Sequence, residues 1–177
     1  MQEEYDVELD WRGFELHPDT PPGGRRIDEY FGAERARAMA ARLVTFADGF
    51  GVHGLASHDR IPNTRKALAV AEFARDRDRL HQLRHAVMEA YWRAGRDIED
   101  DAVLADCARE AGLEPADALA AIGDPLYRGR VDAMGDEARR VGVTGIPTFV
   151  MGRHGVVGCQ PYEALAQLAE EDGATRR

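Results

Sequence analysis

The chain has 177 residues, of which 44% are hydrophobic and 31% are charged, and its formal net charge is −9. This composition is typical of one globular domain with a packed core, whereas the negative charge disfavours nucleic acid, which is bound by neutralising its phosphates. The acidic start, MQEEYD, lacks a signal-peptide pattern, and no apolar run approaches the roughly 20 residues that cross a bilayer. We therefore expect a cytoplasmic protein that contacts neither nucleic acid nor membrane.

The N-terminal part of the chain predicts a strand, a loop and a helix, in that order. Val7, Leu9 and Trp11 alternate with polar residues, which is the two-residue period of a strand. The proline- and glycine-rich HPDTPPGG that follows is typical of a loop. Apolar residues then recur at helical spacing up to Gly49 and Gly51, where we expect the helix to stop: Ala36, Met39, Ala40, Leu43, Phe46 and Ala47.

Five further helices are predicted between residues 62 and 141. They begin after PNT at 62–64, near Leu80, within IEDDAVLADCAREAG, at Pro115 and before Tyr127. The last is the longest, with Gly142 as its C-terminal stop. Its predicted apolar stripe consists of Tyr127, Val131, Met134, Ala138 and Val141.

Strand character returns only near the C-terminus. TFVM at 148–151 and GVV at 155–157 flank GRHG, which predicts a hairpin. A last helix, YEALAQLAEE, is expected to start at Pro161 and to pack through Leu165 and Leu168. A lone hairpin is marginal in water, so we expect the strands at both ends of the chain to form one sheet, with a helical insertion at about 33–141.

Two sequence patterns could mark ligand sites, but we prefer a purely structural interpretation of each. GFGVHG at 49–54 matches the dinucleotide-binding fingerprint, but it follows a helix and not a strand, so we interpret it as a helix stop. His81, His85 and Glu89 form one line along a helix and could ligate a metal, but they alternate with arginines. We expect a solvated helical face there and assign no metal site and no cofactor.

The two cysteines do not form a redox motif. Cys107 lies on an apolar helical stripe and is expected to be a small buried hydrophobe, whereas Cys159 lies between a strand and a helix with no adjacent base to activate it. The acids of DIEDD at 97–101 are explained by the preference of a helix N-terminus for negative charge. The role of Cys159 stays open.

Several separated stretches resemble the DsbA-like family of thioredoxin-fold proteins, in its cytoplasmic FrnE-type branch. They are WRGFELHPDTPPGG, IPNTRKAL, YWRAGRDIEDDAVLADCAREAGL and VGVTGIPTFVMGRHGVVGCQPYEAL, which together span most of the chain. The resemblance implies an α/β fold of the thioredoxin-like, DsbA type over residues 1–177. Its thioredoxin-like parts would be residues 5–31 and 142–172, joined by the helical insertion.

The resemblance also implies a substrate-binding surface. In this family the proline at the position of Pro147 follows a cis peptide bond, and its loop contacts the substrate, which is a protein thiol or an extended peptide. The implied substrate-binding residues are Thr144, Gly145, Ile146 and Pro147. The family's C-P-W-C turn lies between its first strand and first helix, a part that this sequence lacks, so we predict no catalytic residue and a truncated, inert chain.

Three functions remain open at this point. The first is a thiol–disulfide oxidoreductase whose sequence starts late, and the second is a non-catalytic module that binds peptides or proteins by strand-like pairing. The third is a relative of glutathione-dependent 2-hydroxychromene-2-carboxylate isomerase, whose key polar residue also lies in the absent turn. Without the central strand, we expect residues 7–11 to pair directly with 148–151, or a second chain to complete the sheet in a homodimer.

Overall fold

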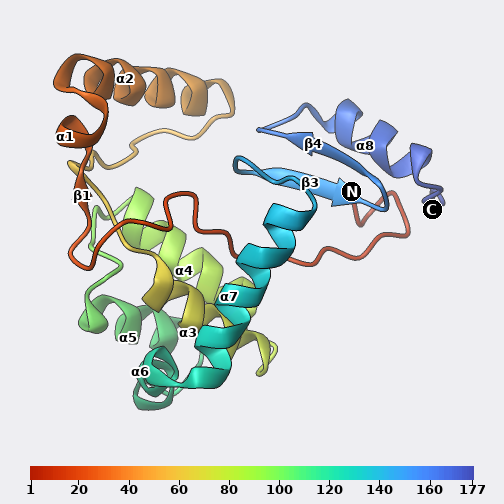
Figure 1. The fold of residues 1–177 in the computed structure, drawn as a ribbon. Coiled ribbons are helices and arrows are strands. Elements are labelled where there is room, and N and C mark those ends of the chain that lie inside the picture. The colour runs from red at the N-terminus through yellow and green to blue at the C-terminus, as the bar shows by residue number, and fades with distance from the viewer. The chain divides into compact units, whose positions relative to one another are not determined.

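The computed structural model describes residues 1–177 and divides them into two units (Figure 1). One unit comprises residues 17–132, and the other combines residues 1–16 with residues 133–177. None of the helices has the length and apolar character that a membrane-spanning segment needs.

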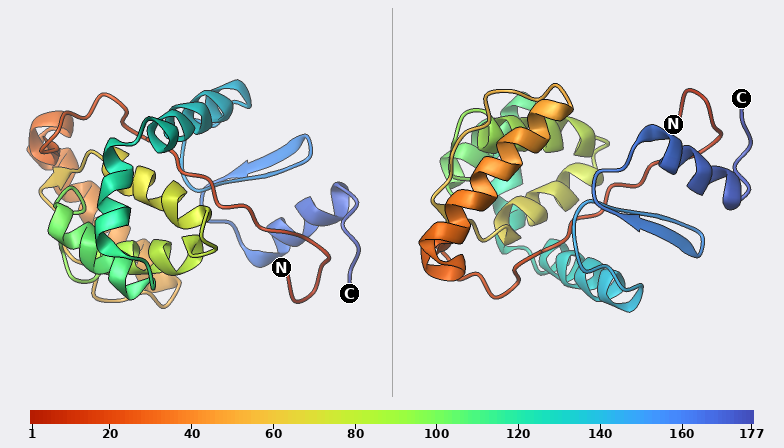
Figure 2. Two further views of the ribbon diagram at one scale, coloured as in Figure 1. Left: turned by 90° about the horizontal axis from the view of Figure 1, so that it is seen from below. Right: turned by 90° about the horizontal axis from the view of Figure 1, so that it is seen from above.

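The first unit is built mainly from helices. Its elements are β1 (Arg25–Arg26), α1 (Ile27–Phe31), α2 (Ala33–Gly49), β2 (Arg60–Ile61), α3 (Arg65–Arg75), α4 (Leu80–Trp92), α5 (Asp101–Glu110), α6 (Pro115–Gly123) and the first half of α7 (Pro125–Arg140). The helices α3 to α6 pack against one another, as Figure 2 shows, and enclose the core around Val70, Leu83 and Leu104. The helices therefore form where apolar residues recur at helical spacing.

Three helix starts in this unit show local side-chain or proline chemistry. The Asp100 carboxylate accepts a hydrogen bond from the Ala102 amide at 2.8 Å and caps α5, as the acids of DIEDD predict. Before α3, the Asn63 side chain accepts from the Arg65 amide at 3.0 Å. Pro115 is the first residue of α6, where its missing N–H costs nothing.

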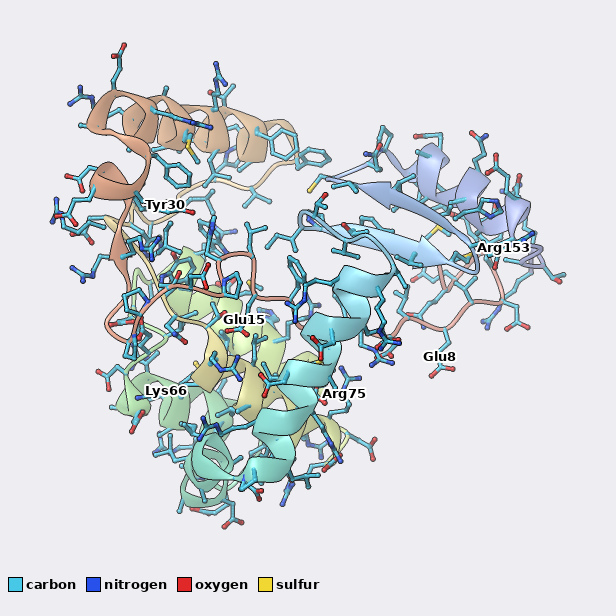
Figure 3. All side chains as sticks on the ribbon, viewed as in Figure 1. Glu8, Glu15, Tyr30, Lys66, Arg75 and Arg153 are labelled. Atoms are coloured by element: carbon cyan, nitrogen blue, oxygen red, sulfur yellow. The ribbon has the colours of Figure 1, made fainter.

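A polar cluster ties the loop before β1 to the loop before α3. The Glu99 carboxylate accepts hydrogen bonds from the amides of Gly23, at 2.8 Å, and Asn63, at 2.7 Å. The Asn63 side chain in turn donates to the carbonyl of Thr20, a buried threonine. Lys66, labelled in Figure 3, donates to the Glu99 carbonyl and to the Asp101 carboxylate. These bonds hold β1 and β2 together, although each strand has two residues.

The second unit contains a hairpin and the last helix. β3 (Thr148–Met151) and β4 (His154–Val157) pair antiparallel, with Thr148 opposite Val157 and Met151 opposite His154. Helix α8 (Tyr162–Glu171) follows, with Leu168 buried and Leu165 half-buried. The predicted hairpin and the predicted packing side of this helix are confirmed.

The chain termini lie beside each other in this unit (Figures 1 and 2). Tyr5 forms an isolated antiparallel bridge with Arg176, and the amide of Asp6 donates to the Thr175 carbonyl at 2.8 Å. The buried Tyr5 hydroxyl donates to the Glu170 carboxylate at 2.6 Å, which raises the pKa of Tyr5. The N-terminus is therefore attached to α8 and the C-terminal tail.

The predicted strand at residues 7–11 is wrong. Residues 6–15 have no regular secondary structure, and β3 pairs with β4 alone, so residues 7–11 do not pair directly with 148–151. The alternation of Val7, Leu9 and Trp11 describes only side chains, whereas a strand also needs a neighbour that accepts its backbone hydrogen bonds. The short elements β1, α1 and β2, by contrast, carry too few residues to produce a periodic signal.

The six helices predicted before Gly142 are present, with ends close to those expected. Val103, Leu104, Cys107 and Ala111 are buried, and so are Tyr127, Val131 and Met134 of the long helix α7. Val141 departs from the predicted stripe and is 60% exposed, because α7 ends at Arg140.

Candidate functional site

The candidate site is the loop that leads from α7 into β3. Gly142 ends α7 with a φ of 79°, a left-handed conformation that glycine adopts without strain. The Val143 amide then donates back to the Ala138 carbonyl at 2.9 Å, and the Gly142 amide donates to the Arg139 carbonyl. These hydrogen bonds at the C-terminal end of α7 fix where the loop that starts at Thr144 leaves the helix.

Two hydrogen bonds hold the loop from Thr144 to Pro147. The hydroxyl of Thr148 donates to the Gly145 carbonyl at 2.7 Å, and the Gly158 amide, just after β4, donates to the Pro147 carbonyl at 2.7 Å. The peptide bond between Ile146 and Pro147 is cis. The loop is therefore held both by its own end of β3 and by the end of β4.

Ile146 projects from this loop into solvent. It is 55% exposed, and its backbone N–H and C=O form no hydrogen bond within the chain. Thr144 and Pro147 are also exposed, whereas Gly145 is half-buried. A side chain at Gly145 would contact the Cγ1 atom of Val157 at 3.4 Å, so the turn lies directly on β4.

An apolar sheet face continues from the loop. In the antiparallel register, Thr148 and Val157 lie opposite each other, and Val150 lies on the same face of the hairpin. Val150 and Val157 are each more than half exposed. The sequence indicated the loop residues but not these two valines, because only the hairpin register assigns them to the exposed face.

The two cysteines differ in accessibility. Cys107 is buried in α5, as predicted, and its burial raises the pKa of the thiol. Cys159 is exposed and follows Gly158, whose amide bonds to Pro147. The cysteines belong to different units and both are free thiols. The accessible thiol, Cys159, therefore directly follows Gly158, the residue whose amide holds the Thr144–Pro147 loop.

The other patterns considered in the sequence lie outside this loop. His81, His85 and Glu89 are exposed on α4, and no group of three or more potential ligands is arranged to hold a metal ion. GFGVHG covers the end of α2 and the loop after it, where the His53 ring lies 2.7 Å from the Asp48 carboxylate. That stretch follows a helix, so it lacks the strand-to-helix geometry of a dinucleotide site.

Comparison with known proteins identifies the family. The DSBA-like thioredoxin domain model matches residues 1–170. A probable DsbA oxidoreductase from Streptomyces coelicolor, known as a crystal structure, superposes with a TM-score of 0.79 and 30% sequence identity, covering 90% of this chain and 73% of that one. The uncharacterized protein YwbO of Bacillus subtilis strain 168 is 25% identical over 172 residues, which is 94% of this chain and 83% of YwbO.

The chain belongs to the DsbA-like thioredoxin domain family, whose members include thiol–disulfide oxidoreductases. The predicted α/β fold class of the DsbA type is therefore confirmed, with helices as the dominant element.

Proposed function

We propose that this chain supplies the substrate-binding surface used in thiol–disulfide exchange on other proteins, and that Thr144, Gly145, Ile146 and Pro147 contact an extended segment of the substrate. The observation that carries the proposal is the exposed Ile146, whose backbone donor and acceptor both remain available. An extended peptide can use such a pair in the way that it adds to the edge of a sheet.

The surroundings of the loop favour an apolar substrate segment. Ile146, Val150 and Val157 are all more than half exposed, so a peptide that covered them would remove apolar surface from water. The Pro147 carbonyl already accepts from Gly158, which leaves Ile146 as the position for main-chain pairing. Unfolded protein segments present both features, apolar side chains and free backbone groups.

Complete disulfide exchange requires two thiols. An attacking thiolate forms a mixed disulfide and releases one substrate thiolate, and a second thiol then resolves the mixed disulfide. Within these 177 residues, Cys107 is buried and Cys159 has no second cysteine in its own unit. We therefore propose that this chain by itself binds substrate without two-thiol turnover, which also makes a peptide-binding module the second candidate function.

We further propose that the protein falls in the FrnE-type branch of the family. Two of the stretches on which that resemblance rests, PPGG and IPNT, lie in the two loops that Glu99 connects. This assignment predicts a protein substrate and not a small aromatic one.

Reduction of insulin disulfides, followed by turbidity in the presence of glutathione, tests the catalytic part. We expect no acceleration by the chain. Turnover that persists after both Cys107→Ser and Cys159→Ser would show that the chemistry has been misplaced.

Fluorescence anisotropy with a short labelled peptide that alternates valine and serine tests the binding part. Ile146→Asp should weaken binding, because it places a charge where apolar side chains meet. Leu126→Asp is the matched control, since Leu126 is 53% exposed in the first turn of α7, where an acid is tolerated. Equal binding by the two variants would exclude this loop as the peptide site.

A further inference from the structure

We draw no further inference here: the strongest candidate, the edge of β3 that faces away from β4 and has no paired strand, adjoins the Thr144–Pro147 loop of the site already described, and nothing in the structure shows what covers it.

Discussion

The Glu99 carboxylate accepts a hydrogen bond from the Gly23 amide at 2.8 Å, although the two residues are 76 positions apart in the chain. The same carboxylate accepts from the Asn63 amide at 2.7 Å, so one side chain satisfies backbone donors of two loops. A charged acceptor forms stronger bonds with backbone amides than a neutral one. Glu99 therefore stabilises a region in which the strands β1 and β2 are too short to be stable through their own pairing alone.

Replacing Glu99 by Gln should destabilise the first unit. Glutamine keeps one acceptor oxygen but turns its NH₂ group toward the second amide, which leaves the amide of Gly23 or of Asn63 without a partner. The expected loss is about 1–3 kcal/mol in the free energy of unfolding, measured by urea denaturation followed by circular dichroism. Glu110→Gln, at an exposed position on α5, is the control and should change that energy by less than about 0.5 kcal/mol. Equal effects of the two variants would contradict the assigned role of Glu99.

Replacing Thr148 by Val should loosen the loop before β3. Valine has nearly the same shape but cannot donate to the Gly145 carbonyl, a bond of 2.7 Å in the structure. We expect a loss of about 0.5–1.5 kcal/mol in unfolding free energy and faster amide hydrogen exchange at residues 145–148. Thr144→Val, four positions earlier in the same exposed loop, should leave exchange at these residues unchanged. An unchanged exchange rate in Thr148→Val would mean that the hydroxyl does not hold the loop.

Stability should fall at alkaline pH because of Tyr91. Burial, with a smaller contribution from the Asp97 carboxylate, raises the pKa of Tyr91 to about 12, against about 10 in an unfolded chain. The unfolded state therefore releases the phenolic proton first, so the contribution of the neutral hydroxyl is complete below pH 10 and is lost as pH rises toward 12.

Tyr91→Phe supplies the reference for this pH dependence. It keeps an aromatic ring against His58, whose ring is stacked on that of Tyr91 at 3.8 Å, but removes the titrating proton. The difference in unfolding free energy between the original protein and Tyr91→Phe should decrease between about pH 10 and pH 12. A difference that stays constant over this range would show that Tyr91 titrates normally.

Local periodicity and capping residues were sufficient to predict most helices. Pro115 starts α6, Asp100 caps α5 and Gly142 ends α7, because each residue favours those positions through its own backbone or side chain. The hairpin of β3 and β4 could be predicted for the same reason, since its strands and turn lie within ten residues. Such features depend on neighbours in sequence and can be derived without a fold.

The candidate site was predictable only in part. The resemblance to DsbA-like proteins indicated Thr144 to Pro147, but nothing in the pattern of residues indicated that Gly158 would hold Pro147 or that Val150 and Val157 would extend the apolar face. Those relationships depend on which residues of β3 and β4 lie opposite each other. Register is set by the turn and by packing together, so it follows from the folded hairpin.

The sequence by itself determined the longer helices, the hairpin and the burial of Cys107, because periodicity and capping residues depend on residues that are close together in the chain. Tertiary structure decided the contacts between distant parts of the chain. It placed Glu99 between two loops, paired Tyr5 with Arg176, and left residues 7–11 without a strand partner. A hydrogen bond forms only where a specific donor and acceptor come within bonding distance. The alternation or composition of a sequence does not indicate which distant residues the fold brings together.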